Sequence, residues 1–397
     1  MENTHEGVLQ AVKKHISTAL DMKQFLYEHP ETARTEYLSS KKIADVLKQA
    51  GYKVEYPFME QELGYPTAFR AILENGTGPS IAIMTEYDAL PNLGHGCGHN
   101  FHGALAILSA LALTELRDSF SGSVYVIGTP AEEEAGAKVP MAEAGIFDDM
   151  ALACMMHSWG GPESFADMDV LALTCYIVEF FGEKAHAASA PWKGHSALAA
   201  ARKFLDLIDA RRECFTPDIR CNAIITNGGE SPNILPDHAE IRLEFRTDSQ
   251  AKLQQMDQSI RKCANGAALA LDCKVTFQKG FDDFDDMVRN SVLEKETEHI
   301  MADFGFKMGV IQAPSGSSDV GNVSYHCPTI QPLVSITDHV YPLHSESLRE
   351  ATMLPEATER LQNGAASLAS VVMKVLTDEA FREEVKNDFI QARQRKL

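Results

Sequence analysis

The sequence predicts an α/β protein: a larger domain with a mostly parallel sheet flanked by helices, and a smaller α+β domain inserted into it. In the first part of the chain, near-continuous apolar strands alternate with helical stretches, which is typical of a sheet covered on both faces. From about residue 173 the order becomes β-α-β-β-α-β, as in a split βαβ domain. The larger domain is therefore expected over residues 1–172 and 288–397, and the smaller over 173–287.

The larger domain is expected to begin with two helices, the second ending near Ala50 because Gly51 favours a left-handed cap. Strands and helices then alternate, with strands at 67–73, 80–86, 123–128 and 151–156 and helices at 101–116 and 138–145. After the insertion we expect a helix over 287–305, a strand over 329–335, a helix over 354–376 and an exposed charged helix over 377–397.

The smaller domain is predicted from four strand patterns and two helices. The clearest strand, 239–246, alternates apolar and polar residues, as a half-buried strand does. The expected strands are 174–181, 221–227, 239–246 and 273–278, and the expected helices are 194–212 and 249–270.

Charge and composition exclude several classes of protein. The 397 residues carry 36 Lys and Arg against 56 Asp and Glu, a formal net charge of −20. Nucleic acids and anionic membranes select basic surfaces, so we expect neither as a partner. The longest apolar run, 103–114, is too short to span a bilayer, and the N-terminus has no signal-peptide pattern. With only eight cysteines, we expect a cytoplasmic protein with free thiols.

Side chains that bind metals follow four separate strands of the larger domain. They are Asp88, His95, Cys97, His99 and His102 after the second strand, Glu132, Glu133 and Glu134 after the third, His157 after the fourth, and Asp338, His339 and His344 after the last. In an open α/β sheet, ligands gather at the carboxyl ends of the strands. The sequence therefore predicts one metal site at one edge of the sheet.

The residue types suit a borderline divalent ion. Imidazole, thiolate and carboxylate ligands together fit Zn²⁺ or Mn²⁺. Of the adjacent Glu132 and Glu133, one can coordinate while the other stays free as a general base for a metal-activated water. Asp88 can orient a ligating imidazole through a hydrogen bond.

Other interpretations of these segments stay open. Residues 95–99 form a glycine-rich turn before a helix, the setting of a phosphate loop, but lack the GxGxxG spacing and the P-loop Lys. Cys97 could be a nucleophile activated by a neighbouring histidine. The acidic run 132–134 could be a solvated turn, although its place after an apolar strand favours a site.

Three loops could contact a substrate. His186 lies in a small-residue loop of the smaller domain, and Asn233 precedes a strand there, although each is weak evidence alone. Asp319 lies in a Gly/Ser-rich loop that could cradle a substrate carboxylate or be an ordinary tight turn.

Taken in order, these segments resemble the amidohydrolase branch of the aminoacylase and carboxypeptidase metallopeptidase superfamily. Within it they are similar to the aminobenzoyl-glutamate hydrolases and β-alanyl-lysine-type dipeptidases. The motifs that carry the resemblance are EYDALP, HGCGHN, PAEE, GEKAHAA, PNILPD and SSDVGNVSY. The resemblance extends from residues 27–31 to 344–348.

The resemblance implies roles for individual residues. The metal ligands would be Cys97, His99, Glu133, His157 and His344, holding two divalent ions per chain. Glu132 would be the general base, and His186 would reach the active site of the partner subunit in a homodimer formed through a lid domain. Asn233 and Arg246 would bind substrate. Asn100 stands where many relatives have Asp, which puts the substrate class in doubt more than metal binding.

The activity implied is hydrolysis of the amide bond of a small molecule: an N-acyl amino acid, a dipeptide or an aryl-amide conjugate of an amino acid. Two alternatives remain at this point. A thiol hydrolase using Cys97 would be indifferent to chelators. A non-catalytic metal-binding protein would be expected to lack one or more of these residues, whereas here the ligand set and Glu132 are complete.

Overall fold

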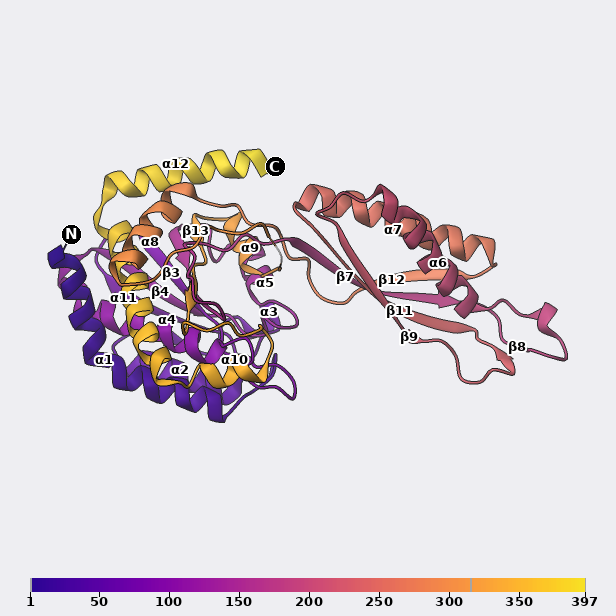
Figure 1. The fold of residues 1–397 in the computed structure, drawn as a ribbon, viewed down its shortest axis with the longest axis horizontal. Coiled ribbons are helices and arrows are strands. Elements are labelled where there is room, and N and C mark those ends of the chain that lie inside the picture. The colour runs from indigo at the N-terminus through magenta and orange to yellow at the C-terminus, as the bar shows by residue number, and fades with distance from the viewer. Residues whose placement is uncertain (1, 315, 397) are drawn as a thin grey trace. The chain divides into compact units, whose positions relative to one another are not determined.

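A computed structural model describes residues 2–314 and 316–396 and divides them into two compact units (Figure 1). Unit 1 comprises the described residues of Met1–Asp169, Met287–Pro314 and Ser318–Leu397. Unit 2 comprises those of Val170–Asp286 and Ser315–Ser317. Apart from the short segment 315–317, the smaller unit is thus a single insertion between two parts of the larger one.

Unit 1 is built on a six-stranded sheet with the order β1-β2-β4-β3-β5-β13. The pairs β3–β4, β3–β5 and β5–β13 are parallel, whereas β1–β2 and β2–β4 are antiparallel. The part of the sheet formed by β4, β3, β5 and β13 is therefore parallel. Apolar side chains on both faces of the central strands explain why these strands are buried. The strands are β1 Lys53–Glu55, β2 Phe69–Asn75, β3 Ser80–Thr85, β4 Gly122–Gly128, β5 Met150–Cys154 and β13 Thr329–Ile330.

The expected strand over 329–335 is two strands, and this prediction was wrong in detail. β13 ends before Gln331 and Pro332, and β14 (Leu333–Ser335) pairs in parallel with β6 (His157–Trp159) in a separate two-stranded sheet. Pro332 has no N–H to donate to a ladder, so the chain changes its pairing partner there.

The helix α4 (His99–Glu115) lies at the centre of unit 1. It is apolar on all sides and buried over nearly its whole length, packed against α1 (Glu2–Glu28) and α11 (Pro355–Thr377). A helix that is apolar all round belongs in a protein core. Among the described residues, no helix combines the length and the apolar content required to span a membrane.

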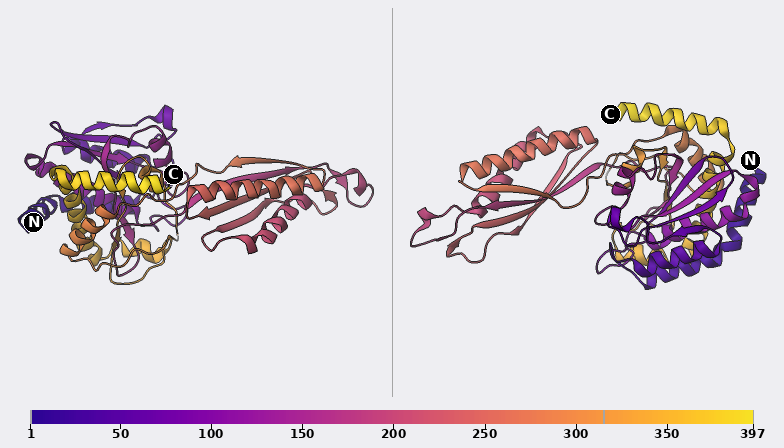
Figure 2. Two further views of the ribbon diagram at one scale, coloured as in Figure 1. Left: turned by 90° about the horizontal axis from the view of Figure 1, so that it is seen from above. Right: turned by 180° about the vertical axis from the view of Figure 1, so that it is seen from behind.

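The remaining elements of unit 1 cover the sheet or connect its strands (Figure 2). They are α2 Tyr37–Gln49, α3 Glu60–Leu63, η1 Arg117–Ser119, α5 Lys138–Glu143, α8 Ser291–Asp303, α9 Val320–Ser324, α10 Glu346–Ala351 and α12 Glu379–Lys396. Gly51 after α2 adopts the predicted left-handed conformation, with φ of 95°. The expectation of an exposed helix in the tail was only half right, because Phe381, Val385 and Phe389 of α12 are buried.

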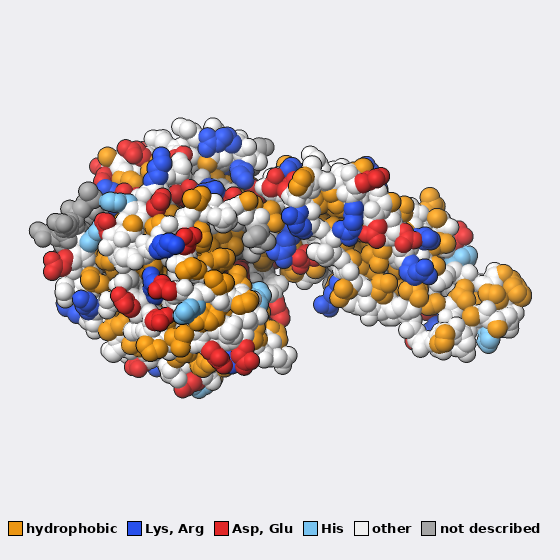
Figure 3. Space-filling view, in the orientation of Figure 1, with side chains coloured by type: hydrophobic (Ala, Val, Ile, Leu, Met, Phe, Trp, Pro, Cys, Tyr) orange, Lys and Arg blue, Asp and Glu red, His pale blue; other side chains and the backbone are white. Residues whose placement is uncertain are grey.

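Unit 2 has the predicted β-α-β-β-α-β order and an antiparallel sheet with the order β12-β7-β11-β9. The helices α6 and α7 pack on one face of this sheet (Figure 2). On the face shown in Figure 3, acidic and basic side chains are interspersed with hydrophobic ones. The elements are β7 Ala172–Phe181, β8 Ala185–His186, η2 Pro191–Lys193, α6 Ala197–Arg211, η3 Arg212–Cys214, β9 Arg220–Asn227, β10 Ile234–Leu235, β11 His238–Thr247, α7 Gln250–Ala270 and β12 Lys274–Lys279.

Candidate metal centre

Three neighbouring parallel strands of unit 1 deliver polar side chains to one edge of its sheet. The segment after β3 contains Asp88 and leads into α4, which begins at His99. Glu132 and Glu133 follow β4, and the chain from β5 leads to His157 at the start of β6. Because the strands run parallel, their carboxyl ends meet at the same edge, and these side chains lie together.

Gly98 allows two of these segments to approach closely. Its φ is 82°, a left-handed conformation that side chains disfavour, and a Cβ there would lie 2.1 Å from Ser158 Oγ. Ser158 Oγ donates a hydrogen bond of 2.8 Å to the carbonyl of Cys97. The second glycine of the HGCGH motif therefore lets the turn before α4 lie directly against β6.

The structure brings together all five side chains that the sequence predicts as metal ligands. We call Cys97, His99, Glu133, His157 and His344 the ligand cluster. Three distances define it. His99 Nε2 lies 3.7 Å from Glu133 Oε1, Cys97 Sγ lies 3.7 Å from His157 Nε2, and His344 Nε2 lies 3.4 Å from Glu133 Oε2.

Asp88 orients two members of the ligand cluster. Its Oδ1 accepts a hydrogen bond of 3.0 Å from His99 Nδ1, and its Oδ2 accepts one of 3.0 Å from the backbone N–H of Glu133. Because Nδ1 of His99 is the donor, Nε2 is the nitrogen that can offer a lone pair to a cation. Within the described residues, His99 Nε2 and Glu133 Oε1 are buried and have no hydrogen-bond partner.

The imidazole of His157 is oriented in the same way as that of His99, with Nδ1 facing a hydrogen-bond acceptor. Its Nδ1 lies 2.7 Å from the carbonyl of Ser158, which can only accept, so Nδ1 donates and Nε2 is the accepting nitrogen, with the Cys97 thiol 3.7 Å away. Buried polar atoms are normally paired, and unpaired ones need an explanation. A divalent cation among these nitrogen, sulfur and oxygen atoms is a chemically fitting one.

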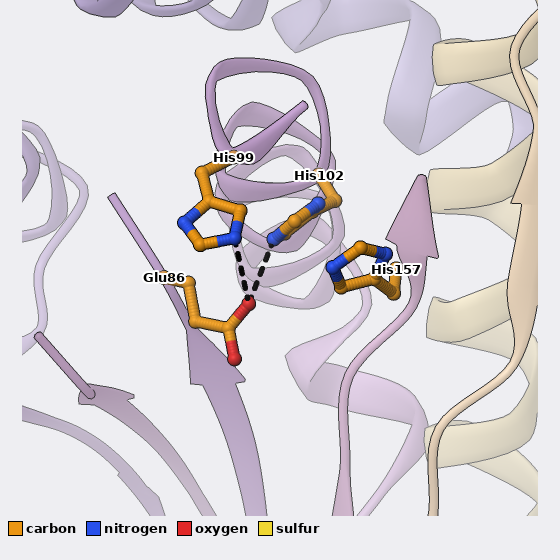
Figure 4. A group of neighbouring side chains, drawn as sticks. All are labelled: Glu86, His99, His102 and His157. Atoms are coloured by element: carbon orange, nitrogen blue, oxygen red, sulfur yellow. Dashed lines mark hydrogen bonds and ion pairs between the residues drawn. The ribbon is translucent and has the colours of Figure 1, made fainter. Parts of the chain in front are cut away.

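A second group of buried polar side chains lies beside the ligand cluster, and Figure 4 shows two of its members, Glu86 and His102, next to His99 and His157. We call Glu86, His102, Lys138 and Asp319 the ion-pair cluster. Lys138 Nζ donates to Glu86 Oε1 and to Asp319 Oδ1, both at 2.6 Å. His102 Nδ1 accepts from the backbone N–H of Ser158 at 3.3 Å, so its Nε2 donates to Glu86 Oε2 at 2.9 Å. These residue types can bind metals, but here protein atoms satisfy them.

Glu132 lies between the two clusters. Its Oε2 is 4.0 Å from His99 Nε2, and its side chain is largely buried. Burial, followed by the charges of Glu86 and Glu133, raises the pKa of Glu132 well above its usual range. A carboxyl group that readily holds a proton at this position suits a residue that takes up and returns protons.

Ionisation in the ligand cluster also responds to burial and charge. Burial raises the pKa of the Cys97 thiol well above its usual range. When no cation is bound, the group is therefore a neutral thiol. Burial alone would lower the pKa of His99, but Asp88 raises it well above its usual value. A cation that binds these atoms therefore has to displace protons.

The predicted residues of unit 2 lie in its loops and at the end of its sheet. His186 pairs with Ile234 between β8 and β10, and its Nδ1 accepts the backbone N–H groups of Ala188 and Ser189, both at 3.2 Å. Asn233 Oδ1 accepts a hydrogen bond of 2.5 Å from Ser231.

Arg246 lies in β11 of unit 2, and its guanidinium is engaged within that unit. Nε and Nη2 donate to Glu244 Oε1 at 3.0 and 2.8 Å, and Nη1 donates to Ser317 Oγ at 3.3 Å. The Glu244 carboxylate already neutralises the positive charge of the Arg246 guanidinium, with which a substrate carboxylate would otherwise pair.

Asp319 does not have the exposed position that a substrate contact requires. It is fully buried in unit 1, and its Oδ1 and Oδ2 accept from Nζ and the backbone N–H of Lys138. In the ion-pair cluster, the Asp319 carboxylate helps to neutralise the buried charge of Lys138.

Sequence reasoning missed Glu86, Lys138 and the role of His102. Glu86 directly follows β3 and precedes Asp88, a position that could have identified it. Lys138 opens the short helix α5, where a lysine is ordinarily exposed, and nothing in the sequence marks it as buried.

Comparison with known proteins supports the same chemistry. Residues 172–271 match the peptidase dimerisation domain of the M20 family. The chain is 34% identical over 346 residues to a mouse Xaa-Arg dipeptidase, covering 83% of this chain and 79% of the relative. It is 30% identical over 331 residues to one of the subunits of the Escherichia coli p-aminobenzoyl-glutamate hydrolase, covering 77% of this chain and 66% of the relative.

A solved structure has the same fold. It is a dinuclear metal-binding peptidase of the M20 family from Bacillus subtilis, with a TM-score of 0.69 and 23% identity, covering 92% of this chain and 99% of the other. Together, the sequence identity and the matched domain establish the family and class of this chain. The chain belongs to the M20 family of metallopeptidases and is a metal-dependent hydrolase of amide bonds.

Proposed function

We propose that this chain hydrolyses the amide bond of dipeptides, N-acyl amino acids or aryl-amide conjugates of amino acids, using two divalent ions, Zn²⁺ or Mn²⁺, held by the ligand cluster. One observation carries the proposal. His99 Nε2 and Glu133 Oε1 are buried, have no hydrogen-bond partner among the described residues and lie 3.7 Å apart, with the carboxylate of Glu132 beside them. The named relatives act on an Xaa-Arg dipeptide and on p-aminobenzoyl-glutamate, both of which fall in this substrate class.

Each residue has a defined task in the proposed reaction. When bound, divalent ions polarise the amide carbonyl and lower the pKa of water. Glu132 takes a proton from the attacking water and returns it to the nitrogen of the leaving amine, which cannot depart as an anion. Asp88 holds the imidazole of His99 and the backbone of Glu133 in place throughout.

His186 is proposed to stabilise the negative charge that develops on the carbonyl oxygen. Because its Nδ1 accepts two backbone N–H groups, the neutral imidazole carries its proton on Nε2 and can donate there. Such a donor typically contributes about 3–4 kcal/mol to a reaction with an oxyanion-like transition state. Asn233, in the neighbouring loop, is proposed to bind substrate.

We also propose that unit 1 is the catalytic metal-binding domain and that unit 2 is a lid through which two copies of the chain form a homodimer. The dimerisation-domain match lies in unit 2. β9 is an edge strand of its sheet, and Ile224 and Ile225 on that strand are exposed. In this arrangement His186 acts in the partner's active site. The eight free cysteines are consistent with the cytoplasm as its location.

The decisive experiment combines metal analysis with a substrate screen. Protein purified without chelator and reloaded with Mn²⁺ or Zn²⁺ should hold close to two ions per chain and hydrolyse members of a panel of dipeptides, N-acyl amino acids and aryl-amide conjugates. Chelator should abolish the activity, whereas alkylation of thiols after metal loading should have little effect. Activity that survives complete metal removal would instead support a thiol mechanism at Cys97.

Subunit mixing tests the position of His186. Neither His186→Ala nor Glu132→Ala should turn over substrate alone. After exchange of subunits, random pairing restores at most about a quarter of the sites, because only mixed dimers contain one complete site. No recovery after proven exchange would show that His186 does not act in the partner's site.

A further inference from the structure

Two consecutive residues of the chain face the same imidazole. His99 Nε2 lies 4.0 Å from Glu132 Oε2 and 3.7 Å from Glu133 Oε1. In an extended strand, neighbouring side chains point to opposite faces, so a continuation of β4 would turn one of these carboxylates away. The backbone between Gly128 and Glu132 therefore decides whether both carboxylates reach the site.

That backbone reverses at Ala131. Ala131 has φ of 61°, a left-handed conformation that is strained for a residue with a side chain. Its carbonyl accepts the N–H groups of Ala135 and Gly136 at 2.9 and 2.7 Å, which closes a tight turn. Such a conformation persists only where the surroundings hold it in place.

The residue that holds it comes from a distant part of the chain. Glu36 precedes α2, and its Oε1 accepts a hydrogen bond of 2.9 Å from the backbone N–H of Ala131. Its Oε2 accepts one of 2.7 Å from Thr67 Oγ1. Glu36 is fully buried, and among the described residues no Lys, Arg or His forms an ion pair with it.

A buried carboxylate without a cationic partner is costly to maintain. The N-terminal end of helix α2 is capped by another residue, Glu31, rather than by the Glu36 side chain. The Glu31 carboxylate accepts hydrogen bonds from the N–H groups of Leu38 and Ser39 at 3.0 and 2.8 Å. The contact that Glu36 makes toward the metal centre is the one to Ala131.

We propose that Glu36 is a positioning residue that fixes the left-handed turn at Ala131 and thereby directs both Glu132 and Glu133 into the metal centre. Glu36 lies outside the ligand cluster and acts on it through the backbone N–H of Ala131. The inference rests on the proposed function for its catalytic consequence, but its effect on metal binding through Glu133 stands independently of any substrate.

The test is a double-mutant cycle between Glu36 and Ala131. Glu36→Ala removes the acceptor, whereas Glu36→Gln keeps a carbonyl oxygen of the same reach. Ala131→Gly removes the conformational strain at the turn and keeps its N–H. Glu31→Ala is the matched control, since it removes a carboxylate five residues away that supports α2 but makes no contact with the turn.

Two readouts are measured for each variant: the affinity for Mn²⁺ and Zn²⁺ by chelator competition, and kcat and KM for the best substrate. Glu36→Ala should weaken metal binding about 10- to 100-fold, as loss of a residue that orients a ligand does. It should also lower kcat about 100-fold with KM changed less than about threefold, because a small misplacement of a catalytic group costs that much. Glu36→Gln should retain most of both.

The cycle separates positioning from general damage. In the Ala131→Gly background the turn needs less support, so Glu36→Ala should cost at least about fivefold less in metal affinity than it does alone. Equal losses in both backgrounds, or a similar loss of metal affinity in Glu31→Ala, would overturn the proposal. If Glu36→Ala does not fold, a Glu36→Gln protein with weakened metal binding that Ala131→Gly does not restore would overturn it as well. If the wild type binds metal but hydrolyses no amide, the proposed function fails while the affinity cycle still tests Glu36.

Discussion

The ligand cluster and the ion-pair cluster occupy the same edge of the unit 1 sheet and use the same residue types, yet they differ in one respect. In the ion-pair cluster, Lys138 supplies the positive charge, and the buried polar atoms of Glu86 and His102 have protein partners at 2.6–3.3 Å. In the ligand cluster, His99 Nε2 and Glu133 Oε1 face each other with no hydrogen-bond partner among the described residues.

The difference shows that residue type alone does not identify a metal site. Glu86, Glu132 and Asp319 lie close enough together to hold a cation, and Lys138 already provides one there. What distinguishes the ligand cluster is the direction of its hydrogen bonds, since Asp88 and the Ser158 carbonyl engage Nδ1 of His99 and of His157, and both Nε2 atoms face other members of the cluster. Facing buried polar atoms that lack a hydrogen-bond partner among the described residues, rather than acidic residues and histidines as such, distinguish the site.

The largest expected effect comes from the carboxylate between the two clusters. Glu132→Gln should lower kcat by about 10³- to 10⁴-fold, the upper part of the range for general acid–base catalysis, because Glu132 serves in two proton transfers. The metal content should stay at the wild-type level, since Glu132 is not in the ligand cluster. Elemental analysis and steady-state kinetics check both points, and a loss of metal together with activity would make Glu132 a ligand instead.

The next effect concerns the ion-pair cluster. Lys138→Met should destabilise the fold by about 3–5 kcal/mol, because it leaves the carboxylates of Glu86 and Asp319 buried without a cation. The control is Lys374→Met, which removes the partly exposed pair between Lys374 on α11 and Asp378, the residue after that helix, and should cost about 0.3–0.5 kcal/mol. Urea unfolding measures both. Equal costs would show that the ion-pair cluster is no more important than a surface pair.

A smaller effect is expected in the orientation of the ligand cluster. Asp88→Asn should weaken metal affinity about 10- to 100-fold, or about 1.4–2.7 kcal/mol, because an amide can turn its NH₂ toward His99 and favour the wrong tautomer. Chelator competition measures the change. A variant with wild-type metal affinity would show that packing alone orients His99.

The last prediction is a pH dependence, in which the compared quantity is the change in slope that Asp88→Asn causes. The pKa values of His99 and Cys97 are both raised, so each has to lose a proton when a metal binds. Metal affinity should therefore rise with pH, by about tenfold per pH unit for each proton released, and fall in acid. In Asp88→Asn the pKa of His99 is lower, so the slope of log affinity against pH should decrease. Equal slopes in both proteins would show that the His99 proton is not displaced.

Much of the fold followed from local patterns. The strands of unit 1 are short apolar runs, and the order of elements in unit 2 was readable from alternation and helical spacing, since both depend on neighbouring residues. The break between β13 and β14 was missed, although Pro332 stood in the sequence as a signal. The buried face of α12 was missed because the segment is rich in charged residues, which predicted an exposed helix. Phe381 and Phe389 nevertheless pack against the rest of unit 1.

One topological rule predicted that the candidate metal-binding side chains would meet at one edge, and the resemblance to a known family then selected five of them as ligands. Each follows a strand, and parallel strands present their carboxyl ends at one edge. Asp88 was also expected to orient an imidazole, and it contacts His99. The partners of Asp319 and Arg246 could not be read in this way, because Lys138 and Glu244 meet them through contacts that no spacing rule specifies.

By itself, the sequence determined the fold class, the insertion and the set of metal-binding residue types, because periodicity and strand order are local properties of the chain. Only the tertiary structure decided which of those side chains have free lone pairs, which are neutralised by Lys138, and how Glu36 contacts Ala131 across 95 residues of sequence. The physical reason is that burial and hydrogen-bond direction depend on atoms from segments far apart in the chain, which meet only when the core is packed.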